Sequence, residues 1–249
     1  MSVETTILNF TGIYEQESFY LQDKSSHFVD LKEVAGTNCM CDDVAKELLL
    51  AKLGDAHGVH FIDNGNYHYV SALYLNQVKE PFSLVVLDHH PDMQRPMFDI
   101  LSCGGWICHV LDTNEYVRDV HVIGADEKLI SELLPEDRER VKFYGDLSEL
   151  PETEFPVYLS IDKDVISRDE LITNWDQGSA TREQVLEFTK ALLQRETQCG
   201  EECSGAGMAC GLLGVDICGE CAPDQEDCDL GAAVRGNDEF NSELLKLLT

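Results

Sequence analysis

The stretch FSLVVLDHHPDMQ, residues 82–94, decides the fold, because it joins a buried strand to a dense group of polar side chains. Residues 82–87 are almost all apolar, as in a strand that is covered on both faces. Asp88, His90 and Asp92 follow at alternate positions. If the chain stays extended, these three side chains point the same way. Two carboxylates and an imidazole at one place would repel or desolvate one another unless a cation lay between them, so the spacing predicts a metal site.

Strands alternate with helices along the rest of the chain. The pattern of apolar residues predicts strands at 58–65 (running into a turn), 82–87, 120–125, 141–145, 155–162 and 208–219, and helices at 68–79, 181–196 and 241–249. Thr181 with Gln184 is expected to cap the second helix, and Asn241 or Ser242 the third. This alternation predicts a three-layer α/β/α fold with a mostly parallel central sheet, in which ligand groups collect at the carboxyl ends of the strands.

The segment 197–207, rich in Gly, Cys and Glu, is expected to be a loop. It is too short to separate two domains, so residues 1–249 are expected to form one domain.

Composition excludes several classes of function. With 18 Lys and Arg against 47 Asp and Glu, the formal net charge of −29 disfavours a nucleic-acid partner. The excess negative charge either steers cationic substrates or simply keeps an acidic surface solvated. No apolar run approaches the roughly 20 residues of a membrane span, and the N-terminus lacks a basic region followed by an apolar core. We therefore expect a cytoplasmic protein without a membrane partner.

The ten cysteines are expected to be scattered reduced thiols, because no secretory signal accompanies them. The alternative is metal binding by two groups of cysteines, Cys218 and Cys221 with Cys228, and Cys199 with Cys203. They would hold zinc or a cluster, although no second Cys-x-x-Cys completes that pattern.

Three further polar groups follow predicted strands: Asp162 with Asp164, the isolated His68, and Asp216 with Glu220. Taken singly, a strand-end Asp is usually a cap and a lone His a satisfied polar residue. His89 is expected to be such a bystander, because it points away from His90. Together, two imidazoles and four carboxylates in one α/β chain favour a metal centre.

At these positions the chain resembles the arginase-like ureohydrolases, which include arginase, agmatinase and formimidoylglutamase. The similar stretches are GNYH (65–68), DHHPD (88–92), SIDKD (160–164) and ECAP (220–223), so the resemblance covers about residues 58–223. It implies an arginase-like fold and a two-manganese centre.

Carried over to this chain, the resemblance assigns one ion to His68, Asp88, Asp92 and Asp162, and the other to Asp88, His90, Asp162 and Asp164. Ligands of this type suit Mn²⁺, with Fe²⁺ or Zn²⁺ as alternatives. The implied reaction is hydrolysis of a C–N bond by a hydroxide that bridges the two ions. Asp92 would accept a hydrogen bond from that hydroxide.

The resemblance also implies a substrate site. Glu220 would face a cationic amidine or guanidinium, or else be an ordinary surface residue. Asn174 and Asp176, in the loop 172–181, would line the pocket beside Trp175. The family's proton-shuttling histidine is replaced by the stretch CGGWICH, where His109 is a weak substitute.

Two classes of function follow. The first is a binuclear hydrolase of a small guanidino or amidino compound, such as an agmatine-like cation, in a monomer or a homo-oligomer. The second is a metal-binding protein of the same fold with lost or altered catalysis and a sensing or structural role. A single-metal, deacetylase-like amidohydrolase is a further alternative.

Overall fold

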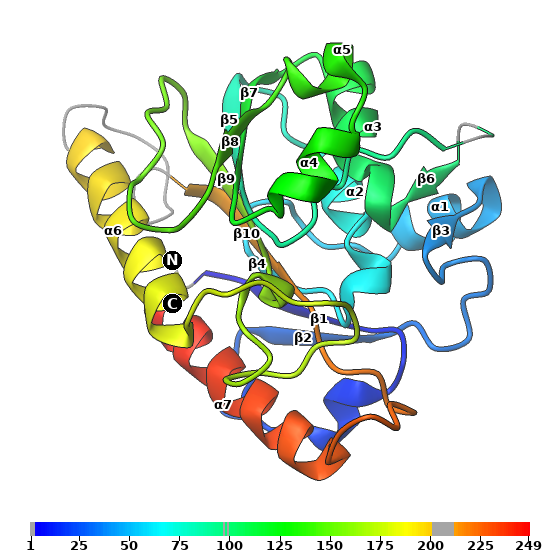
Figure 1. Ribbon diagram of the computed structural model, residues 1–249. Coiled ribbons are helices and arrows are strands. Elements are labelled where there is room, and N and C mark those ends of the chain that lie inside the picture. Colours follow the sequence, from blue (N-terminus) through cyan, green and yellow to red (C-terminus); the bar gives the residue numbers. More distant parts are fainter. Residues whose placement is uncertain (1–2, 97, 99, 201–211) are drawn as a thin grey trace.

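The protein is described here by a computed structural model, which covers residues 3–96, 98, 100–200 and 212–249, apart from the side chains of 196–200. Its centre is an eight-stranded sheet in the order β2-β1-β4-β10-β9-β5-β7-β8 (Figure 1). Every pairing in this sheet is parallel. The strands are β1 (Thr5–Asn9), β2 (Ser26–Asp30), β4 (Val59–Phe61), β5 (Phe82–Leu87), β7 (Val117–Ile123), β8 (Lys142–Tyr144), β9 (Val157–Asp162) and β10 (Leu212–Cys218). A separate antiparallel pair joins β3 (Met40–Cys41) to β6 (Leu101–Ser102).

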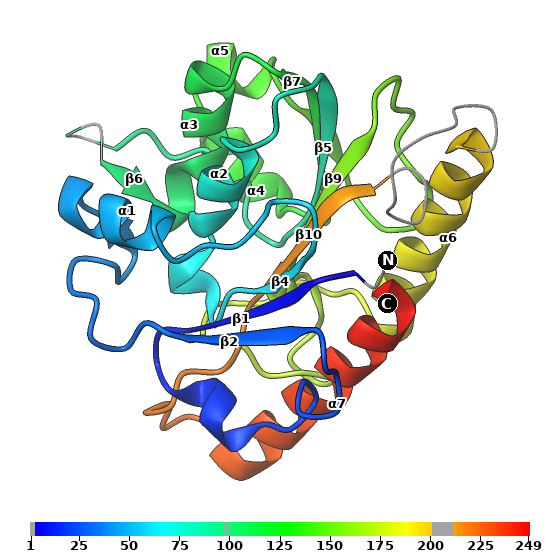
Figure 2. The same cartoon turned by 180° about the vertical axis from the view of Figure 1, so that it is seen from behind.

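Helices cover both faces of the sheet. They are α1 (Asp43–Leu50), α2 (Val70–Leu75), α3 (Trp106–Thr113), α4 (Glu127–Glu132), α5 (Pro135–Arg138), α6 (Arg182–Gly200) and α7 (Leu230–Leu248), with 3-10 helices η1 (Ile13–Gln16), η2 (Gly65–Tyr67), η3 (Cys103–Gly105) and η4 (Lys163–Val165). Helices α1, α2 and α3 lie on one side, and α6 and α7 on the other (Figures 1 and 2).

Each face of the sheet has its own hydrophobic core. In β5, Leu84 and Val86 pack with the core of α1 to α3, whereas Val85 and Leu87 pack with the core of α6 and α7. This alternation follows from the two-residue period of a strand. It confirms the predicted three-layer α/β/α fold with a parallel sheet.

The structure differs from the sequence prediction in several places, and helices α1, α3, α4 and α5 were not predicted. Strands β1 and β2 extend the sheet at an edge where none was predicted. Helix α2 is only six residues long and is preceded by η2. Residues 197–200, the first part of the expected loop, belong to α6. The rest of that loop (201–207) and the start of the expected strand (208–211) lie outside the described residues.

A further difference is that α7 begins at Leu230, capped by Asp229, so Asn241 is an internal helical residue. The buried side chain of Asn241 bonds to Glu17 and Glu220 instead of capping a helix. The capping box of α6 is confirmed, since Thr181 N donates to Gln184 Oε1 (2.8 Å) and Gln184 N to Thr181 Oγ1 (3.1 Å).

Within the described ranges, none of the helices combines the length and the apolar character that a membrane crossing requires. None of the seven described cysteines forms a disulfide.

Candidate metal centre

Six side chains that the sequence singled out come together at the carboxyl ends of β4, β9 and β5, with β10 lying between β4 and β9 in the sheet. His68 follows β4 through η2, Asp88 follows β5, and Asp162 ends β9. The side chains form two compact groups of potential ligands, one of His68, Asp88 and Asp92 and one of Asp88, His90 and Asp164, while Asp162 lies beside His68 in a third. Parallel strands converge on this edge of the sheet, which explains why His68 and Asp162, far apart along the chain, become neighbours.

His68 lies at the centre of one group. Its Nδ1 is 3.3 Å from Asp88 Oδ2, 3.1 Å from Asp92 Oδ2 and 3.4 Å from Asp162 Oδ2. Its Nε2 lies 2.9 Å from Ser160 Oγ. The ring is thus held by Ser160 on one side and presents Nδ1 to three carboxylates on the other.

His90 has the same arrangement in the second group. Its Nδ1 lies 2.8 Å from Asp164 Oδ2 and 3.6 Å from Asp88 Oδ1, and its Nε2 lies 3.1 Å from Asp176 Oδ1. A histidine ligand usually donates its second N–H to a carboxylate or hydroxyl, which fixes the ring and its tautomer. Ser160 and Asp176 occupy these supporting positions.

A turn, not an extended strand, brings Asp88, His90 and Asp92 together. Strand β5 ends at Leu87, and His90 N then donates to Asp88 Oδ1 (2.6 Å). Asp92 has a φ of 47°, a left-handed conformation that an aspartate adopts at a cost. Its Oδ2 accepts a hydrogen bond from Trp106 Nε1 (2.7 Å). The expected extended alternation was therefore wrong, although the three side chains do converge.

The electrostatics of this cluster fit a bound cation. Burial and the nearby Asp88 raise the pKa of Asp92 to about 7. Burial and neighbouring carboxylates also raise the pKa of Asp162 and of Asp164. Burial opposes ionisation of Asp88 too, but the imidazoles of His68 and His90 lower its pKa to about 2.

Two atoms in the cluster lack hydrogen-bond partners, although they are fully buried. They are His68 Nδ1 and Asp88 Oδ2, which face each other. In the described part of the chain, the ion pairs of the four clustered aspartates are with histidines only. Buried carboxylates without a Lys or Arg are compensated best by a metal ion, so the residues fit such a group.

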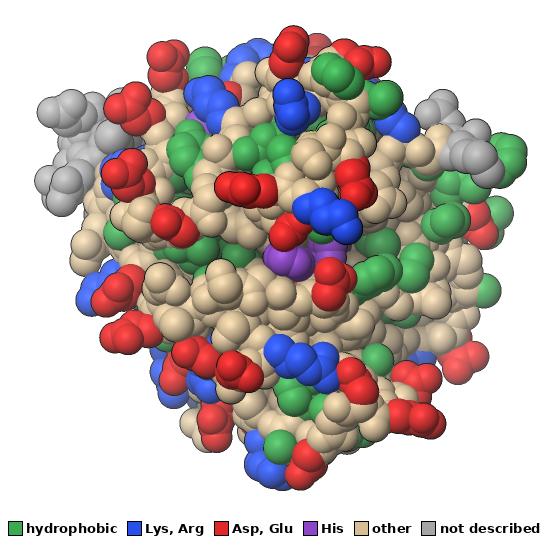
Figure 3. Space-filling view, viewed as in Figure 1, with side chains coloured by type: hydrophobic (Ala, Val, Ile, Leu, Met, Phe, Trp, Pro, Cys, Tyr) green, Lys and Arg blue, Asp and Glu red, His purple; other side chains and the backbone are tan. Residues whose placement is uncertain are grey.

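A cavity of about 580 Å³ opens directly over the cluster. Asp92, Asp162 and Asp164 line its polar end, and Leu129 and Leu133 belong to its apolar wall. Figure 3 shows histidine side chains in a hollow at the centre of this face, with acidic side chains and a basic one beside it.

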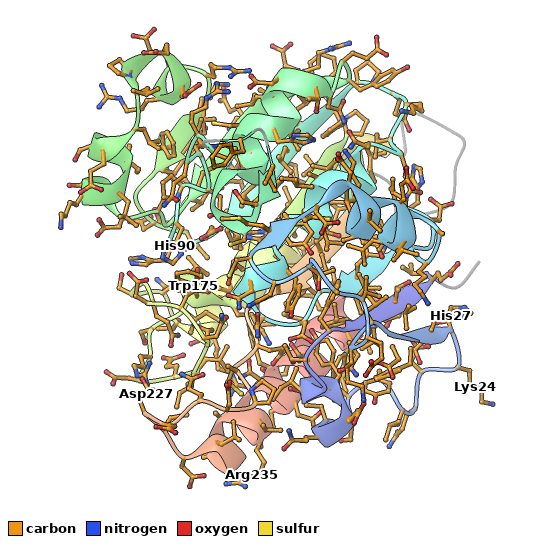
Figure 4. All side chains as sticks on the ribbon, turned by 90° about the vertical axis from the view of Figure 1, so that its right-hand side faces the viewer. Lys24, His27, His90, Trp175, Asp227 and Arg235 are labelled. Carbon is orange, nitrogen blue, oxygen red and sulfur yellow. The ribbon has the colours of Figure 1, made fainter. Side chains whose placement is uncertain are left out.

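His90 and Trp175 both line the cavity and lie side by side at one edge of the molecule, with ring centroids 6.0 Å apart (Figure 4). Trp175 comes from the loop 172–181, which therefore contributes to the cavity wall.

The predicted substrate residues lie in different places. Asn174 bonds to Gly65 N (2.9 Å) through its Oδ1 and ties the loop 172–181 to the turn before His68. Asp176 is exposed and contacts the His90 ring. Neither is among the residues that line the cavity.

Glu220 is fully buried, and its carboxylate pairs with the buried Lys163 ammonium. It does not line the cavity, so the expectation of a Glu220 contact with substrate was wrong. The surface-residue alternative was wrong as well. The physical reason is that Lys163, between two of the aspartates, has no other anionic partner among the described side chains.

His109 lies on α3, half-buried, and does not line the cavity. Trp106, three residues earlier on the same helix, takes the place next to Asp92. The geometry therefore does not support His109 as a proton shuttle.

Sequence reasoning missed Cys218 as a neighbour of the cluster. Its Sγ lies 3.0 Å from Asp162 Oδ2 and forms a third compact group with Asp162 and His68. The available signal was its position at the end of a predicted strand, the same position that pointed to Asp162.

One curated relative is similar along most of the chain. It is an uncharacterized protein of Thermotoga maritima, 30% identical over 220 residues, which cover 87% of this chain and 80% of that protein. No protein-family model matches the chain.

Solved structures of arginase-like enzymes share the fold. The proclavaminate amidino hydrolase of Streptomyces clavuligerus superposes with a TM-score of 0.63 at 15% identity, covering 99% of this chain and 92% of that one. The arginase of Bacillus caldovelox gives 0.60 at 12% identity, with coverages of 97% and 98%. A T. brucei arginase-like protein mutant bound with Mn²⁺ gives 0.55 at 16% identity, with coverages of 99% and 91%. These likenesses confirm the predicted arginase-like fold.

Proposed function

We propose that the protein is a metal-dependent hydrolase of a non-peptide C–N bond. The chain belongs to the sequence family of the Thermotoga maritima protein and has the arginase-like fold. The observation that carries the proposal is the buried cluster of four aspartates and two histidines without a Lys or Arg partner in the described chain. Its substrate would be a small cationic guanidino or amidino compound, for instance an agmatine-like one.

The proposed centre holds two Mn²⁺ ions, with Fe²⁺ or Zn²⁺ as alternatives. The first position has the ligands His68, Asp88, Asp92 and Asp162, and the second Asp88, His90, Asp162 and Asp164. The Mn²⁺ in the T. brucei arginase-like protein supports this choice of metal. When bound, such ions act as Lewis acids and lower the pKa of water toward neutrality.

The chain's own residues would position the reactants. Asp92, held by the indole N–H of Trp106, would accept a hydrogen bond from the attacking water. The apolar wall with Leu129 and Leu133 would hold the carbon chain of the substrate, and Trp175 would flank its headgroup. Glu132, on the same wall, and Asp176 supply negative charge near the opening for a cation.

The test is an activity panel with metal analysis. The purified protein, loaded with Mn²⁺, would be incubated with guanidino and amidino compounds while release of urea, ammonia or formamide is measured. We expect turnover of at least one compound and none by Asp88→Ala, whereas the exposed Asp169→Ala is a matched control that should keep wild-type activity. Two bound ions with no turnover of any compound would contradict the hydrolase proposal.

One observation favours the second class of function, a metal-binding protein without this catalysis. Neither His109 nor Glu220 reaches the cavity, so the described site lacks the two residues that the resemblance assigned to proton transfer and substrate binding. Metal binding without turnover in the same panel is the result that this alternative predicts.

The wider proposal is that residues 1–249 act as one domain in the cytoplasm, as a monomer or homo-oligomer. The net charge of −29 supports a partner other than nucleic acid.

A further inference from the structure

Cys218 is placed beside the proposed metal ligands by the register of the sheet. It is the last residue of β10 and pairs across the sheet with Asp162, the last residue of β9. Both side chains lie on the sheet face that α2 covers, because Cys218 packs in that core. The distance from Cys218 Sγ to Asp162 Oδ2 is 3.0 Å, and the thiol is fully buried.

The backbone after Cys218 is held tightly against the same aspartate. Gly219 has a φ of 95°, and a Cβ atom there would lie 2.5 Å from Asp162 Oδ1 and 2.8 Å from Lys163 N. Only glycine fits this close approach, so the end of β10 stays pressed against the end of β9. The sulfur therefore remains next to Asp162.

Cys218, Asp162 and His68 together have the geometry of a metal-binding group. One donor atom from each lies within 4.8 Å of the others. Two donors that bind the same zinc ion at about 2.0 to 2.3 Å are themselves roughly 3 to 4 Å apart. The sulfur is therefore close enough to share an ion with the aspartate oxygen.

We propose that Cys218 contributes a sulfur donor to the metal position of His68 and Asp162, and so shifts the preference of this position toward thiophilic ions such as Zn²⁺ or Co²⁺ over Mn²⁺. The inference rests on the metal centre of the proposed function and adds a ligand to it. Sulfur ligands select Zn²⁺ over harder ions, whereas carboxylates alone suit Mn²⁺. On binding, the thiol proton passes to solvent and the sulfur binds as thiolate.

The experiment uses the full-length protein, freed of metal and titrated with Co²⁺. A cobalt–sulfur bond gives a strong charge-transfer absorption in the near ultraviolet, which oxygen and nitrogen ligands do not give. We expect this absorption in the wild type, its loss in Cys218→Ser, and its retention in Cys108→Ser. Cys108 is a matched control, because its buried thiol donates to Met93 O (3.3 Å) and is not in a potential ligand group of the described residues.

Metal competition gives a second readout. The ratio of Zn²⁺ to Mn²⁺ affinity, measured by dialysis and metal analysis, should fall by roughly tenfold to a hundredfold in Cys218→Ser. Co²⁺ binding in the wild type without the sulfur absorption would overturn the inference and leave the proposed function standing, with Cys218 only a hydrogen-bond donor to Asp162. No Co²⁺, Zn²⁺ or Mn²⁺ binding by the wild type would overturn the metal centre itself.

Discussion

Replacing Asp92 with asparagine should stabilise the metal-free protein at neutral and higher pH, although it removes a proposed ligand. Burial and Asp88 raise the Asp92 pKa from its ordinary value of 3.8 to about 7. A carboxyl group whose pKa is raised on folding costs stability once it ionises, so the free energy of unfolding falls as pH rises from about 4 to about 7. At about 1.4 kcal/mol for each pKa unit, the cost is roughly 4 kcal/mol. Asparagine carries no charge and keeps an oxygen for the Trp106 indole.

Comparing the two proteins isolates the contribution of this carboxylate. His121, whose pKa burial lowers, contributes a pH dependence of the opposite sign to both proteins. Asp88, with a pKa of about 2, loses its stabilising effect only below about pH 4. The difference in unfolding free energy between Asp92→Asn and wild type should therefore grow by up to about 3 kcal/mol in favour of the variant between pH 5 and pH 8.

The assay is urea unfolding followed by tryptophan fluorescence at pH 5, 6, 7 and 8, first with chelator and then with Mn²⁺. With Mn²⁺ the order should reverse at pH 8, because binding to the native state stabilises the wild type and the variant lacks a ligand. Asp169→Asn, which changes an exposed aspartate, should show neither effect. A difference between Asp92→Asn and wild type that stays constant from pH 5 to pH 8 in chelator would refute the reasoning.

Four further substitutions separate the roles of neighbouring residues. Asp88→Ala should abolish binding of both metal ions whereas His68→Ala should weaken chiefly one, and equal metal content in wild type and Asp88→Ala would contradict the bridging assignment. Asp176→Asn should lower metal affinity at the His90 position by roughly tenfold, measured by isothermal titration, because the variant loses the charged acceptor for His90 Nε2. Glu220→Gln should lower the free energy of unfolding by about 3 kcal/mol in chemical denaturation and leave metal content unchanged, because it breaks a buried ion pair; a raised KM with unchanged stability would restore Glu220 as a substrate contact.

The sheet could be predicted where buried strands consist of nearly continuous apolar residues, which β1 (TTILN), although fully buried, does not. Residues 82–87 and 157–162 are fully buried continuous strands, and such runs have few other interpretations. Strand β2, at the edge, has a mixed pattern of exposed and half-buried residues and gave no such signal. The start of α7 was missed because Asn241, which looks like a cap, is a buried partner of Lys163.

The six clustered side chains could be predicted for a related reason. Asp88, Asp162 and their neighbours follow directly from strand ends, and a parallel sheet brings all such ends to one edge. Residues whose position depends on a loop or on a long-range partner could not be placed this way. Asn174 and Asp176 belong to a loop whose course the sequence does not fix, and Glu220 depends on an ion pair 57 residues away along the chain.

The buried pair of Lys163 and Glu220 changes what recognises a substrate. Lys163 lies between Asp162 and Asp164, and its ammonium also donates to Asn237 (2.7 Å) and Asn241 (3.1 Å) on α7. With Glu220 neutralising that ammonium, Lys163 is anchored to α7, whereas Asp162 and Asp164 line the cavity. A cationic headgroup would then meet the metal cluster on one side and the loop 172–181, through Trp175, on the other. Specificity for one guanidino or amidino compound over another should therefore change with substitutions in the loop 172–181, while substitutions at Glu220 change stability.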